Sequence, residues 1–111
     1  MAPRRGDIYR INLEPTVGSE QQGTARPCLV LSLGAYNNKL PTIGVVPLSS
    51  SPRELPPLIV SVSSAGKATS MAICNQARTV DKRRIVDGLM GQLSAEDLHR
   101  VESGLRHYYG L

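Results

Sequence analysis

Proline and glycine divide this chain into short apolar segments, and this division constrains its fold more than any other feature. The 111 residues include 8 Pro and 10 Gly, and strand-length apolar segments bounded by such residues are typical of all-β domains. Apolar or alternating segments lie at 7–13, 27–33, 41–48, 58–62 and 70–74, with a final pair at 85–86 and 89–93. We therefore expect a small β-barrel of five to seven short strands.

Only the last part of the chain has the periodicity of a helix. Ser94 can act as an N-cap, and Asp97 three residues later gives a weak capping box. An apolar stripe with helical spacing follows, formed by Leu98, Val101, Leu105 and Tyr108. A helix over 95–108 is predicted, and it caps the barrel. Gly104 in its middle costs about 1 kcal/mol relative to Ala, but it permits another backbone to approach closely.

The length of the chain fits one domain spanning 1–111. A chain of this size buries roughly two-thirds of its unfolded surface, which is enough for one core. No apolar run approaches the roughly 18 residues that a membrane span needs. The first residues also lack the apolar stretch of a secretory signal. We therefore expect a cytoplasmic protein with no membrane partner.

Arginine dominates the charge of the chain. Lys and Arg number 13 against 9 acids, which gives a net charge of +4, and ten of the 13 cations are Arg. The guanidinium fork matches phosphate, so this excess is compatible with a nucleic-acid ligand, although many basic proteins bind none. Trp and Phe are absent and only four Tyr are present, which leaves little material for an aromatic platform that stacks RNA bases.

The cysteines and histidines do not form a metal-binding pattern. Cys28 and Cys74 lie inside apolar runs without a C-x-x-C motif, so we expect two reduced thiols in the core. His99 and His107 lie off the apolar stripe of the predicted helix and are expected at the surface, because one helix face cannot easily grip a phosphate from both sides. No metal and no cofactor are predicted.

A polar loop at 16–25 separates the first two predicted strands. Loops of this length in small domains are usually functional or mobile. Arg26 stands at its end, and Pro27 biases that residue toward extended backbone. Arg26 therefore either projects into a groove or pairs with Glu20 or Asp7.

Polar side chains that could contact RNA lie elsewhere as well. In the loop, Glu20 and Gln21 could bond base edges of splayed RNA. Further candidates follow predicted strands, namely Ser49 with Ser50, and the cluster of Asn75, Gln76 and Arg78. The serines could instead form a solvated turn, and Arg78 could hold either a phosphate or Asp81. The basic run 82–84 could steer RNA, but such a run is more often a solvated turn.

Three motifs in register resemble the MazF/PemK family of toxin endoribonucleases. They are Arg5-Gly6-Asp7-Ile8-Tyr9, Gly18-Ser19-Glu20-Gln21 and Arg26-Pro27, and Pro47-Leu48-Ser49 and Asp81 extend the resemblance over nearly the whole chain. The resemblance implies an SH3-like β-barrel, of the PemK/CcdB-like kind, with a C-terminal helix. It also implies a homodimer that cuts single-stranded RNA, usually mRNA, at short motifs without a metal.

The family also implies partners. A MazE-like antitoxin protein would block the RNA groove, and the two together would bind DNA. The alternative function is that of CcdB-like toxins, which share a related fold and bind DNA gyrase without being enzymes. The presence of Arg26 with Pro27 favours the ribonuclease.

The resemblance assigns catalysis to Arg26 and Ser49. A fixed guanidinium would stabilise the charge that develops on the phosphate as the ribose 2′-hydroxyl attacks, and one such donor is worth about 3–4 kcal/mol. The expected products are a 2′,3′-cyclic phosphate (or 3′-phosphate) and a 5′-hydroxyl. Ser49 stands where the family usually has Thr and keeps the hydroxyl.

The chain departs from the family pattern at two further places. The segment Gly23–Arg26 is one residue longer than the commonest spacing. One branch of the family has an Arg-Cys-Asp trio with a His in the first loop. Here the matching positions hold Ile73, Cys74 and Asn75, with Ser19 in the loop. The predicted mechanism therefore depends on the Arg26–Ser49 pair.

Overall fold

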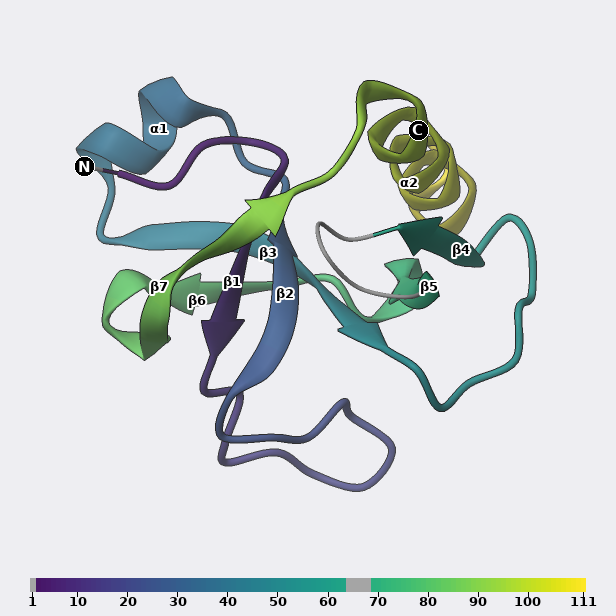
Figure 1. The fold of residues 1–111 in the computed structure, drawn as a ribbon, viewed down its shortest axis with the longest axis horizontal. Helices are drawn as coiled ribbons and strands as arrows, with labels where there is room; N and C mark the ends of the chain where they lie inside the picture. The colour runs from purple at the N-terminus through teal and green to yellow at the C-terminus, as the bar shows by residue number, and fades with distance from the viewer. Residues whose placement is uncertain (1, 64–68) are drawn as a thin grey trace.

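The computed structural model describes residues 2–63 and 69–111, and its fold is mainly β (Figure 1). Seven antiparallel strands are present, β1 (Asp7–Ile11), β2 (Arg26–Val30), β3 (Thr42–Ser49), β4 (Ile59–Ser63), β5 (Thr69–Ile73), β6 (Arg78–Asp81) and β7 (Ile85–Gln92). The helices are α1 (Gly34–Lys39) and α2 (Ala95–Tyr109), and the 3₁₀ turns are η1 (Cys74–Gln76) and η2 (Lys82–Arg84). The predicted β fold with a C-terminal helix is confirmed.

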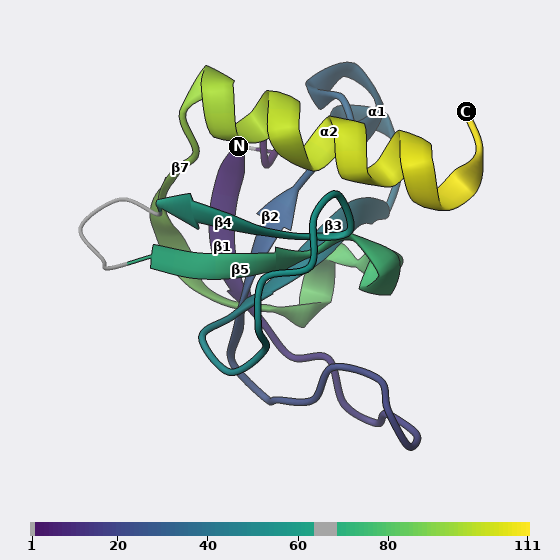
Figure 2. The same ribbon diagram turned by 90° about the vertical axis from the view of Figure 1, so that its right-hand side faces the viewer.

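The strands form one curved sheet in the order β4-β5-β3-β2-β1-β7. The long strand β3 joins the two parts of this sheet. The first residues of β3 pair with β6, and its last residues pair with β5, which in turn pairs with β4. In the described part of the chain, no pairing connects the edge strands β4 and β7. The sheet is therefore not closed by hydrogen bonds, in contrast to the continuous barrel that the strand count suggested. Helix α2 lies across one end of the sheet and packs against β4 and η1 (Figure 2).

Two apolar clusters fill the two sides of the sheet, and β2 contributes to both. Leu29 belongs to the cluster under α2, whereas Cys28 and Val30 belong to the second cluster. A strand buried on both faces needs apolar residues at every position, which explains the unbroken apolar run in this part of the sequence. The Cys28 and Cys74 thiols are free and buried, as predicted. Burial raises the pKa of Cys28 to about 12 and that of Cys74 to about 11.

Helix α2 begins and ends where the sequence predicts. The Ser94 hydroxyl accepts a hydrogen bond from the Asp97 N–H at 3.1 Å, and the C-cap Gly110 has a left-handed backbone with φ of 72°. Gly104 is buried, and a Cβ at this position would lie 2.5 Å from the Pro57 carbonyl oxygen and 2.6 Å from Cys74 Sγ. The predicted close approach of another backbone is thus confirmed, and it brings η1 against the helix.

Two segments differ from the sequence-based expectation. The Asn37-Asn38 pair is a turn signal in the sequence, so a turn is expected over 34–40. This segment instead contains helix α1, in which Asn37 is buried and its amide nitrogen donates to the Pro3 and Ser32 carbonyls. This Asn ties the N-terminal segment to the helix and is not a turn residue. The polar segment expected after residue 74 becomes η1 and then β6, in which Val80 is buried between polar neighbours. Four residues are too few for alternation to be recognised in sequence.

Candidate active site

The β1–β2 loop extends from the body of the protein on the side away from α2 (Figures 1 and 2). Glu14 holds the base of this loop together. One carboxylate oxygen accepts hydrogen bonds from the Thr16 N–H at 3.1 Å and hydroxyl at 2.9 Å, and the other accepts from the Gly23 N–H at 2.8 Å. The bond from Gly23, followed by that from the Thr16 hydroxyl, lowers the pKa of Glu14. At neutral pH the charged carboxylate therefore joins the two ends of the loop.

Arg26 leaves this loop as the first residue of β2. Its Nε donates to the Gln22 carbonyl at 2.9 Å, and one terminal nitrogen lies 3.5 Å from Ser49 Oγ, at the long end of the hydrogen-bond range. Gly23 has φ of +137°, and a Cβ there would lie 3.3 Å from Arg26 Cβ. Glycine at this position thus lets the loop turn back against the arginine.

Neither of the carboxylates expected as partners pairs with Arg26. Asp7 is buried, and it accepts bonds from the Arg4 N–H and the Gln92 amide. Glu20 accepts a bond from the Val17 N–H at 2.9 Å. Within the described residues, no carboxylate oxygen lies within 4.0 Å of the Arg26 guanidinium. The positive charge of Arg26 is thus available to an anion from outside the chain.

Ser49 is buried at the end of β3, where its Oγ also accepts a bond from the Ser51 N–H at 3.3 Å. The pairing of Cys28 with Pro47 sets the register between β2 and β3. Two residues further along this register, Arg26 stands opposite Ser49. The structure therefore brings together the two residues that the sequence assigned to catalysis. Ser50 is exposed at the next position.

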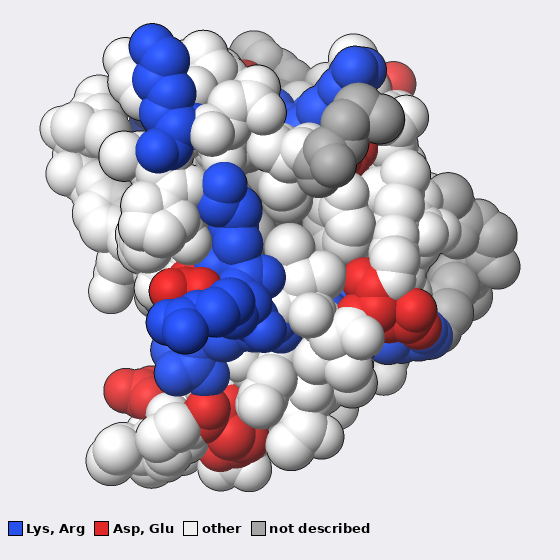
Figure 3. Space-filling view, turned by 90° about the vertical axis from the view of Figure 1, so that its left-hand side faces the viewer, with Lys and Arg blue, Asp and Glu red and all other residues white. Residues whose placement is uncertain are grey.

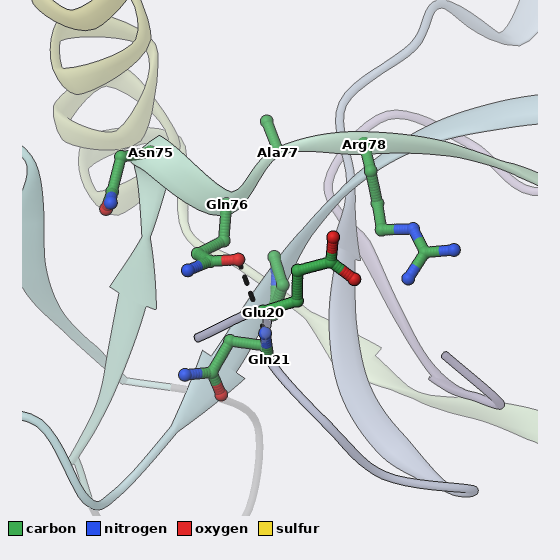
Figure 4. A pocket seen from close by; sticks show the side chains of 7 residues that line it. Glu20, Gln21, Asn75, Gln76, Ala77 and Arg78 are labelled. Atoms are coloured by element: carbon green, nitrogen blue, oxygen red, sulfur yellow. Dashed lines mark hydrogen bonds between the residues drawn. The ribbon is translucent and has the colours of Figure 1, made fainter. Parts of the chain in front are cut away.

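A cavity of about 320 Å³ (Figure 4) is lined in part by Pro47 of β3, two residues before Ser49, whereas neither Arg26 nor Ser49 is among its lining residues. Pro47 and Ser49 face the same side of β3, because side chains alternate along a strand, and Pro47 forms part of the cavity wall. The remaining lining residues come from the loop tip, from η1 and from the start of β6: Glu20, Gln21, Asn75, Gln76, Ala77 and Arg78. Five of the six predicted substrate contacts thus gather here, and Ser50 is not among the lining residues.

The polar lining residues differ in how they are bonded. Arg78 donates to the Leu13 carbonyl at 3.0 Å, and Asp81, its expected partner, pairs with Arg83 instead at 3.1 Å. The Asn75 Oδ1 atom is buried without a hydrogen-bond partner in the described part of the chain. The Gln76 amide nitrogen donates to the Ser19 carbonyl at 3.0 Å, and its oxygen accepts from the Gln21 N–H at 3.3 Å (Figure 4).

The basic run 82–84 forms η2 and does not line the cavity. Figure 3 shows the side of the protein on which η2 lies in Figure 1, and Lys and Arg side chains gather there. Lys82 donates to the Asn37 carbonyl, and Arg83 pairs with Asp81. Arg84 donates to the carbonyls of Asn12 and Glu14 at 3.1 and 2.6 Å. This run is thus a turn whose cations already have partners.

Sequence reasoning missed Glu14 and Arg84, the two residues that support the base of the loop. Neither belongs to a motif, and their partners lie nine and 70 residues away along the chain. The histidines were predicted correctly, since His99 and His107 are exposed on α2. In the parts of the chain that the structure describes, no three His, Cys, Asp or Glu side chains cluster as a metal site would require. In the same residues, no helix is both long and apolar enough to span a membrane.

Known proteins share both the sequence pattern and this fold. Residues 4–109 match the family of PemK-like, MazF-like toxins of type II toxin–antitoxin systems. The chain belongs to this family. It is 32% identical over 110 residues to endoribonuclease EndoA of Bacillus subtilis. The aligned region covers 96% of this chain and 93% of EndoA. It is also 35% identical over 82 residues to endoribonuclease PemK of Escherichia coli. This aligned region covers 71% of this chain and 61% of PemK.

Solved structures of the PemK/MazF family share the fold over the full chain. MazF from Deinococcus radiodurans superposes with a TM-score of 0.88 at 26% identity, covering 100% of this chain and 99% of that one. An endoribonuclease from a mycobacterial species, solved in complex with its cognate antitoxin, has a TM-score of 0.81 at 24% identity, covering 99% of this chain and 97% of that one. At 24% identity, the likeness to the mycobacterial structure shows a shared fold alone.

Proposed function

We propose that this PemK/MazF-family chain is an endoribonuclease toxin that cuts single-stranded RNA at the Arg26–Ser49 pair, with no metal in the reaction. The observation that carries the proposal is the Arg26 guanidinium, which has no carboxylate partner in the described residues and lies 3.5 Å from a buried hydroxyl. A cavity of about 320 Å³ with mostly polar lining residues is connected to this pair through Pro47 of β3, which lines it. The relatives EndoA and PemK are named endoribonucleases, and this chain is an endoribonuclease of the same family.

The proposed reaction needs only groups that this site, the RNA and solvent water provide. The ribose 2′-hydroxyl attacks the adjacent phosphorus and loses its proton to water, while the bond from phosphorus to the 5′-oxygen of the next nucleotide breaks and that oxygen takes up a proton from water to become a 5′-hydroxyl. The product is a 2′,3′-cyclic phosphate, which water can open to a 3′-phosphate. Arg26 stabilises the negative charge on the non-bridging oxygens, since a guanidinium stays protonated and is a donor only. The Ser49 hydroxyl donates a second hydrogen bond to the same phosphate.

The cavity supplies the proposed contacts to the bases of the RNA. Glu20, Gln21 and Asn75 offer carboxylate and amide groups that can pair with the edges of splayed bases. Arg78 uses one nitrogen for the Leu13 carbonyl and offers the rest of its guanidinium to a phosphate or a base. Ser50, exposed next to Ser49, contacts the RNA backbone at the rim.

The proposed assembly is a homodimer that a MazE-like antitoxin inhibits in the cytoplasm, where mRNA is present. A mostly apolar groove between β3, β6 and the end of α2 supports a protein–protein contact. Val45, Leu105 and Tyr109 line it, and Tyr109 and Leu111 are exposed. Exposed apolar patches of this kind mark interaction surfaces. The family to which the chain belongs, toxins of type II toxin–antitoxin systems, supports an antitoxin as the inhibitor.

Cleavage of a long mixed-sequence RNA in EDTA tests this function. Mapping the 5′ ends by primer extension should reveal discrete cuts that share a motif of a few bases, with 5′-hydroxyl ends, and Arg26→Ala should abolish them. Loss of cutting on chelation would contradict the metal-free reaction. Toxicity that survives in Arg26→Ala would instead support the CcdB-like alternative of gyrase binding, which the family match does not favour.

A further inference from the structure

We propose that Gln76 is a positioning residue that clamps the tip of the β1–β2 loop over the cavity and thereby sets the position of Arg26. Its catalytic consequence rests on the function proposed above, but the clamp itself is a structural claim. Gln76 lines the cavity, yet both ends of its amide are engaged by the loop backbone and not directed to a ligand.

The loop is attached to the protein at two levels. Its base is held by the Glu14 carboxylate and by Arg84, and the Leu13 N–H donates to the Gly23 carbonyl at 2.8 Å. The tip of the loop consists of residues 17–21. The described hydrogen bonds inside this segment join Glu20 to Val17. The hydrogen bonds that connect this tip to the rest of the described chain both come from Gln76.

The residue that holds the tip is itself rigidly anchored. Gln76 ends η1, whose first residue, Cys74, is buried. The Cys74 N–H donates to the Leu58 carbonyl at 2.9 Å, and Gly104 of α2 lets the helix approach this turn closely. The clamp therefore links a loop at the surface to the packed core, 55 residues further along the chain.

The chemistry of the clamp requires an amide. A carboxamide offers one acceptor and one donor side by side, so it can pair with a backbone N–H and a backbone carbonyl at once. The Gln21 N–H and the Ser19 carbonyl are used in this way. The next residue, Gln22, accepts the bond from Arg26 Nε. Release of the tip should therefore move the carbonyl that orients the guanidinium.

The substitution Gln76→Glu tests the clamp with a pH-dependent readout. An ionised carboxylate accepts from the Gln21 N–H but repels the Ser19 carbonyl, whereas a protonated carboxyl again offers a donor and an acceptor. At pH 7 the bond to the Ser19 carbonyl is lost and the loop tip opens more often as a unit, so we expect backbone hydrogen exchange at Gln21 to be about tenfold faster than in the unaltered protein, as for the loss of one hydrogen bond. The difference should shrink toward pH 4, where Glu is substantially protonated.

Two further variants isolate the cause of the effect. Gln76→Ala removes both hydrogen bonds and should accelerate exchange at every pH. Gln22→Glu adds the same charge to the same loop at an exposed side chain and should leave exchange at Gln21 unchanged. In cleavage assays, Gln76→Glu should lose about tenfold in kcat at pH 7 by the same reasoning, and the loss should recover as the pH falls.

The outcomes separate this inference from the proposed function. Unchanged exchange at Gln21 in Gln76→Glu at pH 7 would overturn the clamp, whatever the activity. Faster exchange with an unchanged kcat would overturn the positioning role and leave the ribonuclease intact. A changed cleavage motif with unchanged exchange would make Gln76 a base-reading residue instead. If the unaltered protein cuts no RNA, the proposed function fails, while the exchange measurements still decide the clamp.

Discussion

Two arginine-bearing regions of this protein, the turn η2 and the start of β2, differ in the partners available to their charges. The turn η2 carries the densest run of cations, and each of its three side chains already has a hydrogen-bond or ion-pair partner. Arg26 stands alone at the start of β2, with a carbonyl and a distant hydroxyl as neighbours and no carboxylate among the described residues. A charge that the fold leaves uncompensated is a better indicator of an anion site than the local density of charge.

The largest expected effect comes from Arg26. Arg26→Ala should reduce kcat by about 10²–10³-fold, as for the loss of one preorganised donor to a developing negative charge. Arg83→Ala is the matched control on η2 and should change cleavage less than about twofold, because surface pairs contribute little. Single-turnover cleavage of a short RNA measures both. Comparable losses in the two variants would show that general electrostatic attraction, and not the position of Arg26, drives cleavage.

A second comparison concerns two neighbouring serines, one buried and one exposed. Ser49→Ala should lower kcat by about 10–100-fold, since a hydrogen bond to a charged group is worth about 1.5–3 kcal/mol. Ser50→Ala should mainly raise KM, and by less, because Ser50 is exposed. Steady-state kinetics on one RNA substrate separates the two effects. If Ser50→Ala has the larger effect on kcat, the hydroxyl that acts on the phosphate is the exposed one.

Within η2, Arg84 and Arg83 should differ in their effect on stability. Arg84→Ala removes donors to two carbonyls at the base of the loop and should lower the free energy of unfolding by about 1–2 kcal/mol. Arg83→Ala should leave the free energy of unfolding nearly unchanged, because this side chain is exposed. Urea unfolding at neutral pH measures both. An equal loss would mean that the carbonyl contacts of Arg84 contribute nothing beyond a surface charge.

The smallest expected effect is a pH dependence of loop closure through Glu14. Bonds from the Gly23 N–H and from Thr16 lower the pKa of this carboxyl in the folded protein below its ordinary value of 4.5. Its stabilising contribution is therefore full above pH 4.5 and is lost as the pH falls through the lowered folded pKa. NMR of the Gly23 amide should show the transition, and Glu14→Gln should remove it. An identical transition in Glu14→Gln would assign it to another group.

Local patterns in the sequence were enough to predict most of the short strands, helix α2 with its N-cap Ser94, the buried cysteines and the surface histidines. Each of these depends on residue spacing and side-chain polarity within a few positions. The polar strand β6 and the buried Asn37 were not predictable in this way. β6 is polar because Val80 is its one buried residue and lies between the exposed Thr79 and the half-buried Asp81. Asn37 is tolerated in the core because the Pro3 and Ser32 carbonyls satisfy its amide.

By itself, the sequence singled out the residues that we propose carry the chemistry, because Arg26 and Ser49 are marked by their motifs and by their positions at strand ends. Only the tertiary structure decided which partners the charged and polar side chains bind. Asp81 pairs with Arg83 and not with Arg78, Asp7 bonds Gln92 and not Arg26, and Gln76 closes a loop 55 residues away. Hydrogen bonds and ion pairs act over a few ångströms, so they depend on sheet register and on the path of the loops, which emerge only when distant segments pack together.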